Sequence, residues 1–436
     1  MIDEAASSAG TDKRVGGLLR IGAVWAGSGA LGAIPYALLP LGAMLVAGNQ
    51  ADLLVGRVIA AGNLVVLAMP IAAGALSDRT VSRWGRRTPW LVVLSLVTTA
   101  GLLLLGLAAA PVVLVLSFLV YQVGASGTGG IFTAILPDLV PIEARGLASG
   151  LLSTMLGVGG VASLAMITGV LLLRGENHAG LLASYGLLAV IVLAATAITV
   201  TTLRERPSVR VGRVASPSAP LWVSISRFLS ALRDRDFAWS AVNRALFNFG
   251  YFSVQPFVAF YFKDVGRSSR PATSAAIWAL FTVLAAVGPA ILGGRMSDRI
   301  RRRKPFLYMS GAGQAIVVSV MVIGLPYSPW LAYGDAAVFG VFYGLYYAVD
   351  LALACDVLPD RLAAGRDMGI WHAALTVPAV LAPAIAAPVL HFFNQPGQTV
   401  LGLATGSNLG YRVVFLSAAA WFVLGTLAVT QIRRVR

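Results

Sequence analysis

The chain has 436 residues, of which 58% are hydrophobic and 12% charged, about half the charge of a typical soluble domain. This composition excludes a soluble globular protein, and the single cysteine excludes a scaffold of intrachain disulfides. The net charge is +15, from 33 Lys and Arg against 18 Asp and Glu, and all but three of these cations are arginines. Because the arginines fall in short clusters between long apolar runs, they indicate membrane topology, and we expect no nucleic-acid partner.

Twelve apolar runs are long enough to cross a bilayer, since a helix needs about 20 mainly apolar residues to span about 30 Å of hydrocarbon. We therefore predict an all-α membrane protein whose helices contact lipid. The first run is too long for a cleaved signal peptide, and we expect it to remain in the protein. The predicted spans are 20–47, 55–77, 88–109, 112–136, 147–173, 180–203, 238–262, 272–294, 305–325, 331–356, 367–391 and 409–430.

The arginine clusters predict the orientation, because cytoplasmic loops carry the excess of cations. Placing the N-terminus inside puts every large cluster inside, and only Lys263, Arg267 and Arg270 add appreciable positive charge to an outer loop. We expect both termini in the cytoplasm, and a plasma membrane that the arginine-rich composition suggests is bacterial. The inner clusters are Arg79–Arg87, Arg204–Arg235, Arg295–Lys304, Arg361 with Arg366, and Arg433–Arg436.

The polar segments divide the chain into five parts. Residues 204–236 form the longest polar stretch, rich in Arg, Ser and Pro, and are predicted to be a cytoplasmic linker between two bundles of six helices. The bundles comprise 16–203 and 237–430. Residues 1–15 are expected to be a disordered cytoplasmic tail, and 431–436 a basic cytoplasmic tail.

Two sequence anchors indicate that the halves are duplicated. Gly74-Ala-Leu-Ser-Asp78-Arg79 recurs as Gly294-Arg-Met-Ser-Asp298-Arg299, and Asp138-Leu-Val-Pro recurs as Asp356-Val-Leu-Pro, at shifts of 220 and 218 residues. Duplication predicts two pseudo-symmetric bundles, and a site between such bundles can open to either side when one rocks against the other. This favours a carrier, although channels and membrane enzymes can also contain repeats.

The segment from Gly74 to Arg87 is predicted to be a cytoplasmic gate. A glycine one turn before a helix end allows close helix approach, the aspartate can accept from a helix N-terminus, and arginines can bridge to carboxylates. The alternative is an arginine cluster that only orients the chain, but recurrence of the spacing favours a gate. The residues assigned to it are Gly74, Asp78, Arg79, Gly85, Arg86, Arg87, Asp138, Arg145, Gly294, Asp298, Arg299, Asp356 and Arg366.

With these motifs the chain resembles the major facilitator superfamily. Within it, SerAspArgThrValSerArgTrpGlyArgArgThrPro (77–89), Ile34-Pro-Tyr, 134–141 and 356–369 look like the glycoside-pentoside-hexuronide symporters and sucrose-type carriers. The resemblance implies two pseudo-symmetric six-helix bundles and cation-coupled uptake of a sugar or glycoside by alternating access. It also implies a cavity lined by spans one, four, seven and ten. Melibiose-type carriers place cation-binding acids where this chain has Val65 and Met69, so protons are favoured over sodium.

Ionisable residues inside spans are costly and are therefore functional candidates. Asp350 and Arg244 each lie about 9 Å from the cytoplasmic end of their spans, at a depth that permits pairing. Burial would raise the pKa of such an acid and a nearby arginine would lower it, so we expect Asp350 to be the proton-sensitive group. The alternative is a purely structural ion pair. His372 is a further candidate, although an interior imidazole without a proton-carrying role is also consistent with its position.

Side chains that share a helix face with these residues are expected to bind the substrate. Stacking rings and paired hydrogen-bonding groups suit a sugar, whose C–H face packs on aromatic rings. The alternatives are packing, an interfacial aromatic belt, or amides that bond a neighbouring helix. The candidates are Asn248, Tyr251 and Gln255 beside Arg244, Phe339, Tyr343 and Tyr346 beside Asp350, Gln122, Ser126 and Thr133 in span four, and Trp25 and Tyr36 in span one.

No catalytic motif is present. The sequence has no HExxH, CxxC or phosphate-binding Gly-x-x-x-x-Gly-Lys-Ser/Thr, so we expect no enzyme activity, no cofactor and no metal. The alternatives are an exporter of drugs, metabolites or lipid-like compounds, and a membrane enzyme or pigment-assembly protein on a carrier-like fold. The expected partners are a small-molecule substrate, a coupling cation and the bilayer, and the expected state is a monomer.

Overall fold

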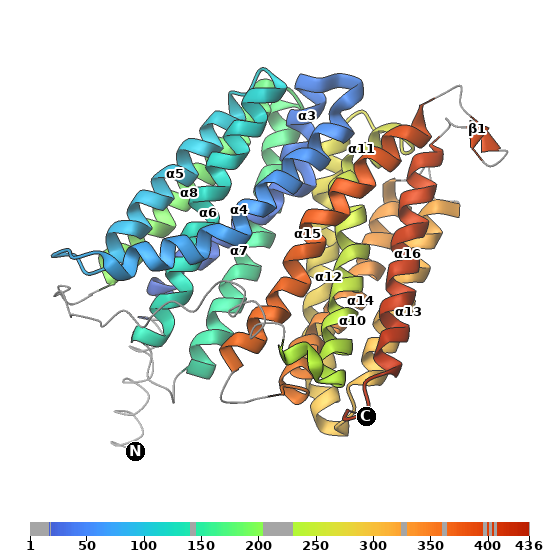
Figure 1. Cartoon of the computed structure of the whole chain (residues 1–436). Helices are drawn as coiled ribbons and strands as arrows, with labels where there is room; N and C mark the ends of the chain where they lie inside the picture. Colours follow the sequence, from blue (N-terminus) through green and yellow to red (C-terminus); the bar gives the residue numbers. More distant parts are fainter. Residues whose placement is uncertain are drawn as a thin grey trace, which may run out of the picture. The chain divides into compact units, whose positions relative to one another are not determined.

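The computed structural model describes residues 17, 19–139, 145–203, 230–323, 329–359, 364–395, 399–400, 403–404 and 408–435. These residues are almost entirely helical (Figure 1). The exceptions with regular structure are two short antiparallel strands, β1 (Thr399–Val400) and β2 (Leu403–Ala404). The predicted tail 1–15 and most of the predicted linker lie outside the described residues, as do the side chains of Asp138, Arg145 and Arg366.

The chain divides into two compact units. Unit 1 comprises 1–48 and 61–212, and unit 2 comprises 49–60 and 213–436. Unit 1 contains α2 (Ala23–Ala30), α3 (Leu39–Ala47), most of α4 (Ala51–Arg79), α5 (Thr88–Gly106), α6 (Pro111–Leu139), α7 (Arg145–Arg174) and α8 (His178–Thr202). Unit 2 contains α10 (Arg235–Val254), α11 (Val258–Asp264), α12 (Pro271–Ile300), α13 (Lys304–Ile323), α14 (Pro329–Asp356), α15 (Ala364–Asn394) and α16 (Leu409–Thr430).

Ten helical segments of the described residues are long and apolar enough to cross a membrane. One of them, Leu19–Arg79, contains both of the first two predicted spans, because the chain stays helical through the turn between them. The predicted seventh span corresponds to α10 and α11, and polar residues such as Asn243, Arg244 and Asn248 lower its hydropathy below that of the ten. The helices therefore account for all twelve predicted spans.

Proline interrupts the first and seventh spans at similar places. Between α2 and α3, Leu31–Ala33 is a 3-10 turn and Ile34–Leu38, which includes Pro35, is a π-helical turn. Between α10 and α11, the 3-10 turn η6 (Gln255–Phe257) contains Pro256. Proline lacks an N–H and clashes with the preceding turn, so each break follows from the sequence.

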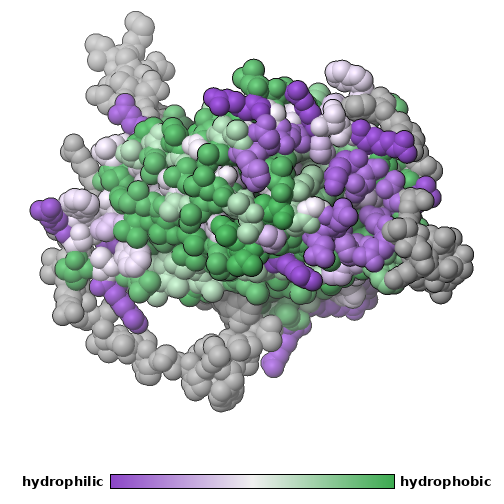
Figure 2. All heavy atoms as spheres, turned by 90° about the horizontal axis from the view of Figure 1, so that it is seen from above, coloured by the Kyte–Doolittle hydropathy of each residue, from purple (hydrophilic) through white to green (hydrophobic). Residues whose placement is uncertain are grey.

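The outer surfaces of the helices carry large apolar side chains. Ile71 is 75% exposed, Leu173 87% and Trp330 79%. Figure 2 shows hydrophobic residues reaching the surface between hydrophilic ones on the face seen there. Exposed apolar residues in this number indicate contact with lipid rather than with water.

Glycines bring α14 unusually close to α12. A Cβ added at Gly340 would lie 2.2 Å from the Thr282 carbonyl oxygen, and one at Gly344 would lie 2.1 Å from that of Ala286. No larger residue fits at either position without moving the backbone. This packing fixes α14, which carries most of the polar side chains described below.

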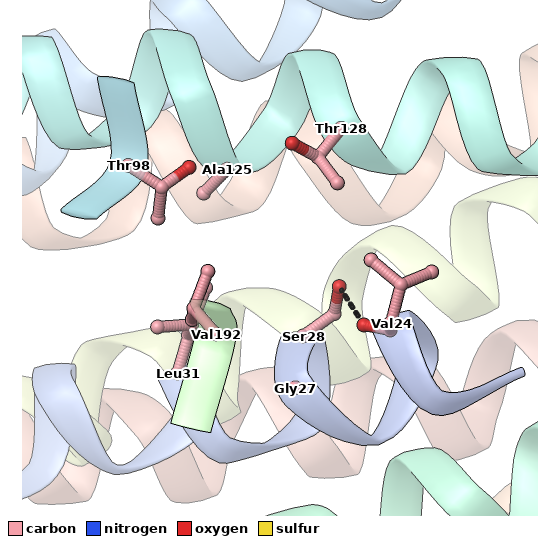
Figure 3. A pocket seen from close by; sticks show the side chains of 8 residues that line it. All are labelled: Val24, Gly27, Ser28, Leu31, Thr98, Ala125, Thr128 and Val192. Atoms are coloured by element: carbon pink, nitrogen blue, oxygen red, sulfur yellow. Dashed lines mark hydrogen bonds between the residues drawn. The ribbon is translucent and has the colours of Figure 1, made fainter. Parts of the chain in front are cut away.

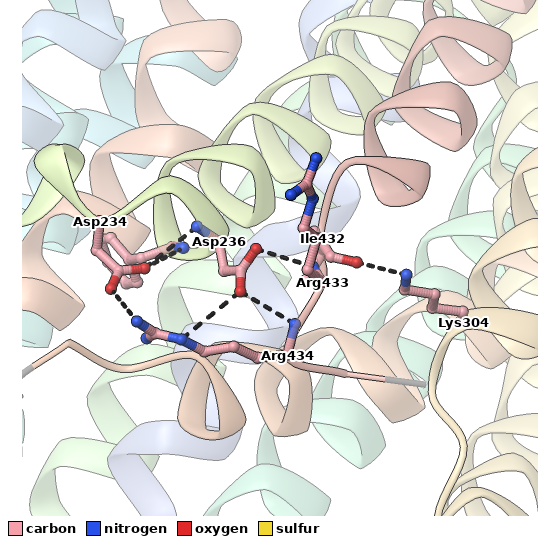
Figure 4. Close-up of polar contacts among 7 residues, drawn as sticks. Asp234, Asp236, Lys304, Ile432, Arg433 and Arg434 are labelled. Atoms are coloured by element: carbon pink, nitrogen blue, oxygen red, sulfur yellow. Dashed lines mark hydrogen bonds and ion pairs between the residues drawn. The ribbon is translucent and has the colours of Figure 1, made fainter.

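The end of unit 2 predicted to face the cytoplasm, called the inner end here, is tied together by its own C-terminal residues (Figure 4). Asp234 caps α10 by accepting hydrogen bonds from the backbone N–H groups of Asp236 and Phe237, both at 3.1 Å. The Asp236 carboxylate accepts from the backbone N–H groups of Arg433 at 2.8 Å and Arg434 at 3.0 Å. These contacts join the start of α10 to the segment that follows α16.

The opposite end of unit 2 contains a second polar cluster. His391 of α15 lies 3.1 Å from the carboxylate of Asp52 in the first turn of α4, and Gln395 lies 2.7 Å from its other ring nitrogen. In the same unit, the Tyr411 hydroxyl of α16 donates a hydrogen bond to the Asp264 carboxylate of α11 at 2.5 Å. The His391–Asp52 contact attaches residues 49–60 to unit 2, although the rest of α4 belongs to unit 1.

Candidate functional site

The centre of the candidate site in unit 2 is an ion pair between α10 and α14. Arg244 Nη1 donates a hydrogen bond to Asp350 Oδ2. The pair is deeply buried, since the Arg244 side chain is 11% exposed and that of Asp350 2%. The equal depth expected from the sequence therefore corresponds to a direct contact.

Trp371 of α15 completes this pair. The Arg244 guanidinium carbon lies 4.7 Å from the centre of the Trp371 ring, which is the geometry of a cation–π contact. Sequence analysis did not select Trp371, because an aromatic residue in an apolar helix looks like ordinary packing. Its depth in the helix could have selected it. Trp371 lies seven residues after the first residue of α15, and Asp350 lies six residues before the last residue of α14.

An aromatic wall extends from the ion pair along α14. Tyr346 stacks on Phe247 of α10 with ring centres 4.1 Å apart, and Tyr343 stacks on Tyr251 at 5.1 Å. Phe339 continues the row, 6.2 Å from Tyr343. Three of the predicted substrate-binding tyrosines thus belong to one wall, together with Phe247, which sequence analysis did not select.

Four buried polar atoms of this cluster have no hydrogen-bond partner among the described residues. They are Arg244 Nε, Asp350 Oδ1, the Tyr346 hydroxyl and Trp371 Nε1. Leaving a buried donor or acceptor unpaired costs about 1–3 kcal/mol, so four in one place form an energetically costly arrangement. A ligand that offers donors and acceptors to these atoms would recover that cost.

The remaining candidates of unit 2 lie around this cluster in different environments. Asn248 donates to the backbone carbonyl of Arg244 at 2.8 Å, and thus bonds within its own helix. Gln255 is buried at the start of η6. His372 follows Trp371 directly and is exposed. The structure brings Arg244, Asp350, Tyr346, Tyr343 and Tyr251 together most closely.

In unit 1, the predicted substrate residues are dispersed. Trp25 of α2 stacks on Phe132 of α6 with ring centres 5.2 Å apart, and Tyr36 is buried in the π-helical turn. Ser126 donates to the backbone carbonyl of Gln122, and Thr133 to that of Gly130. Trp25 also packs against an apolar cluster that includes Val24 and Leu94.

A pocket in unit 1 is lined by residues that sequence analysis did not select (Figure 3). Its hydroxyl groups are all satisfied within their own helices: Ser28 donates to Val24, Thr98 to Leu94 and Thr128 to Gly124. Each hydroxyl oxygen keeps acceptor capacity, and the rest of the lining is apolar. The lining residues are Val24, Gly27, Ser28, Leu31, Thr98, Ala125, Thr128 and Val192.

The predicted gate residues of unit 1 form a compact polar cluster at the loop between α4 and α5, called loop 1. Arg87 lies 3.5 Å from the Asp78 carboxylate and donates to the Ser77 hydroxyl at 3.3 Å. Arg86 lies 3.8 Å from Asp78. Arg79 is exposed. A Cβ added at Gly74 would have no heavy atom within 4 Å, so the close helix approach expected there is absent from the described residues.

The loop between α12 and α13, called loop 2, contains the corresponding cluster. Arg303 donates to Asp298 at 2.5 Å, to Asp356 at 3.2 Å and to the Ser297 hydroxyl at 3.0 Å. Burial lowers the pKa of Arg303, but the hydrogen bonds to Asp298 and Asp356 outweigh that effect and raise it, so Arg303 stays charged. Arg303 was not assigned to the gate, whereas the assigned Arg299 is exposed.

The helix approach near loop 2 occurs one residue from the expected glycine. A Cβ added at Gly293 would lie 2.6 Å from Leu345 of α14, whereas one at Gly294 would have only the Ala348 carbonyl oxygen, at 3.9 Å. The gate motif therefore marks the right helix end, but its first glycine does not make the close contact in either unit.

A comparison with known protein families identifies the family of this chain. The family model described as Major Facilitator Superfamily matches residues 18–383, and the chain belongs to this family. It is therefore a membrane transporter and not an enzyme. No curated protein matches the chain.

Several solved structures share the fold at low sequence identity. The nucleoside transporter NupG is 14% identical with a TM-score of 0.68, and the match covers 95% of this chain and 98% of that one. A bacterial homologue of the human lysosomal transporter Spinster is 16% identical with a TM-score of 0.65, covering 96% of both chains. A D-xylose-proton symporter is 16% identical with a TM-score of 0.64, covering 93% of this chain and 95% of that one.

Proposed function

We propose that the protein is a secondary active transporter that moves a small polar solute, a sugar or glycoside, across the plasma membrane by alternating access coupled to protons. The observation that carries the proposal is the buried cluster of Arg244, Asp350, Tyr346 and Trp371, whose four unpartnered polar atoms lie beside an aromatic wall. A sugar presents hydroxyl groups to such atoms and C–H faces to such rings.

The similarities support the same substrate class. The segment 77–89 looks like the glycoside-pentoside-hexuronide symporters, and one structural neighbour is a xylose-proton symporter. The absence of acids at Val65 and Met69 favours protons over sodium as the coupling ion. An exporter of apolar compounds is the alternative, which the phenylalanines and tyrosines of the wall would also suit.

The direct test is uptake by purified protein in liposomes. Labelled monosaccharides, disaccharides and nucleosides are offered under an imposed pH gradient, with a sodium gradient as control. We expect accumulation of a sugar or glycoside that depends on the pH gradient alone. Accumulation only of nucleosides, or extrusion only of a lipophilic dye, would show that the substrate is a nucleoside or an apolar compound and not a sugar or glycoside.

Two tyrosines of unit 2 provide a matched test of the site. The Tyr346 hydroxyl has no partner among the described residues, whereas the Tyr261 hydroxyl donates to the Met321 carbonyl oxygen at 2.9 Å. Since a hydrogen bond contributes about 0.5–1.5 kcal/mol, Tyr346→Phe should raise the half-saturating substrate concentration roughly three- to tenfold and leave thermal stability intact. Tyr261→Phe should lower stability by about 1 kcal/mol and leave half-saturation unchanged. If Tyr261→Phe raised the half-saturating concentration and Tyr346→Phe did not, the substrate would not bind at Tyr346.

Asp350 is the acid through which we expect protons and substrate to influence each other. Arg244 stabilises its charged form, and a substrate that engages Arg244 would weaken that stabilisation. Asp350→Asn should abolish accumulation driven by a pH gradient and also weaken exchange of labelled for unlabelled substrate. A variant that retained full pH-driven accumulation would remove Asp350 from the mechanism.

A further inference from the structure

Asp335 is a second buried acid on α14, and its surroundings differ from those of Asp350. Its residue surface is 8% exposed, and its Oδ2 atom has no hydrogen-bond partner among the described residues. No ion pair within the described part of the chain involves it. Sequence analysis did not select this residue, which lies four positions inside the predicted end of span ten.

The packing of α14 on α12 buries the segment of α14 that carries Asp335. The hydroxyl of Thr282 donates to the carbonyl oxygen of Ala336, the residue after Asp335, at 3.3 Å. Thr282 lies 11 residues after the first residue of α12, or about 16 Å along the axis at 1.5 Å per residue. Along α14 itself, Asp335 lies six residues, or about 9 Å, after Pro329, the first residue of that helix.

The charged side chains on the elements around α14 lie toward the two ends of the helices, and Lys263 follows Phe262, whose ring centre lies 6.1 Å from that of Tyr333. At the outer end, Asp264 of α11 is bonded to Tyr411, Lys263 is exposed, and Arg270 precedes the first turn of α12. The other titratable side chains around this part of α14 are tyrosines: Tyr333 and Tyr343 on α14, Tyr251 on α10 and Tyr261 on α11. The charged residues of the packed helices lie nearer the inner end: Arg235, Asp236 and Arg244 on α10, Arg295, Asp298 and Arg299 on α12, and Lys304 on α13.

An ionised carboxylate in such a place is far too costly to remain bare, since even a neutral polar group buried without a partner costs several kcal/mol in hydrocarbon. The group must therefore be neutralised by a bound proton or a metal cation. The described residues contain no group of three or more His, Cys, Asp or Glu side chains that could hold a metal ion. A single carboxyl with no other charged ligand is suited to a proton.

Asp335 also lies on the face of α14 that carries the candidate site. Phe339, Tyr343, Tyr346 and Asp350 follow it at offsets of 4, 8, 11 and 15 residues, which stay within about 80° of one another at 3.6 residues per turn. The two acids are about 22 Å apart along the helix, and the aromatic wall lies between them. Of these two acids, Asp350 is the one that pairs with an arginine of the described residues.

We propose that Asp335 is a second proton-binding site, distinct from the Arg244–Asp350 pair, and that accumulation driven by a pH gradient requires both acids. This rests on the proposed function as a proton-coupled transporter. Asp335 takes a proton when its end of unit 2 is wetted and retains it, as a neutral carboxylic acid, when the carboxyl is buried as in this structure. Asp350 remains the group that responds to substrate.

Infrared spectroscopy of the purified protein tests the site without any substrate. Wild type should show the C=O stretching band of a protonated carboxyl at neutral pH, and Asp335→Asn should lack it, whereas Asp335→Glu should show it at a shifted position. Identical spectra for wild type and Asp335→Asn would overturn the proposal. Loss of the band on replacing choline chloride with sodium chloride would also overturn it, because the bound cation would then be sodium. Should Asp335→Asn not fold, an unshifted band in Asp335→Glu overturns the proposal in the same way.

Transport assays test the coupling role. With the sugar or glycoside that wild type accumulates, Asp335→Asn should retain exchange of labelled for unlabelled substrate to within about twofold and lose accumulation driven by a pH gradient. Full accumulation by this variant would overturn the coupling role. If wild type transports none of the probes, the proposed function fails, while the infrared band still decides whether Asp335 binds a proton.

Discussion

Loop 1 in unit 1 and loop 2 in unit 2 contain the same local arrangement built from different residues. In each, an arginine two positions before a proline reaches back to a Ser-Asp pair at the end of the preceding helix: Arg87 to Ser77 and Asp78, and Arg303 to Ser297 and Asp298. In each, the residue two positions before that arginine has a positive φ. The duplication suggested by the sequence anchors therefore extends to side-chain contacts.

The loops differ in the residue that adopts the positive φ, which makes them useful as internal controls. Arg303 binds a second carboxylate, Asp356 at the end of α14, whose counterpart in the repeat, Asp138, lies outside the described side chains. The positive φ is adopted by Gly85, at 88°, in loop 1 and by Arg301, at 52°, in loop 2. Loop 2 thus holds a residue with a side chain in the left-handed conformation where loop 1 has a glycine, which shows that the repeat keeps the backbone geometry although the residue type differs.

Removal of Arg303 from loop 2 should cause the largest loss of stability among the loop variants. Arg303→Ala loses hydrogen bonds to two carboxylates and a hydroxyl, and should lower the free energy of unfolding by about 2 kcal/mol after allowance for solvent screening of the exposed carboxylates. Arg87→Ala loses the contacts to Ser77 and Asp78 and should lower the free energy of unfolding by at least about 1 kcal/mol. Thermal unfolding in detergent measures both. Arg299→Ala, at an exposed position in the same cluster, serves as control and should change stability by less than about 0.5 kcal/mol. A loss at Arg303 no larger than that at Arg299 would contradict the contribution of the Arg303 hydrogen bonds.

The backbone of loop 1 gives the next largest effect. Gly85→Ala places a Cβ on a residue with φ of 88°, and this should cost about 1 kcal/mol because left-handed conformations are unfavourable for residues with side chains. The change should appear as a lower midpoint of thermal unfolding. Gly74→Ala is the matched control, since an added Cβ there meets no heavy atom within 4 Å and the position is helical, so stability should be maintained or rise. A loss at Gly74 as large as that at Gly85 would show that packing, not φ, governs these positions.

Sequence reasoning works for this protein where physics leaves a periodic or charged signal. The apolar runs account for the helices, and equal depth on shared faces brings Arg244, Asp350 and the tyrosines together. Trp371 gives no such signal, because its cation–π contact depends on where α15 packs. Among four consecutive cations at 301–304, only the geometry of the turn selects Arg303. Asp335 could be recognised as buried only once the packing of α14 on α12 was known.

The smallest predicted effect is a gain in stability at loop 2. Arg301 caps α12 in the left-handed region, with its backbone N–H donating to the Asp298 carbonyl oxygen at 3.4 Å, and its side chain is exposed. Arg301→Gly removes the steric cost of that conformation but gives the unfolded chain more freedom, so the net gain should be about 0.5 kcal/mol. Arg301→Ala, which keeps a Cβ, should show no gain, and this pair separates backbone strain from loss of charge. If both variants were stabilised equally, repulsion among the clustered cations would explain the gain, and loop 2 would differ from loop 1 in electrostatics instead of strain.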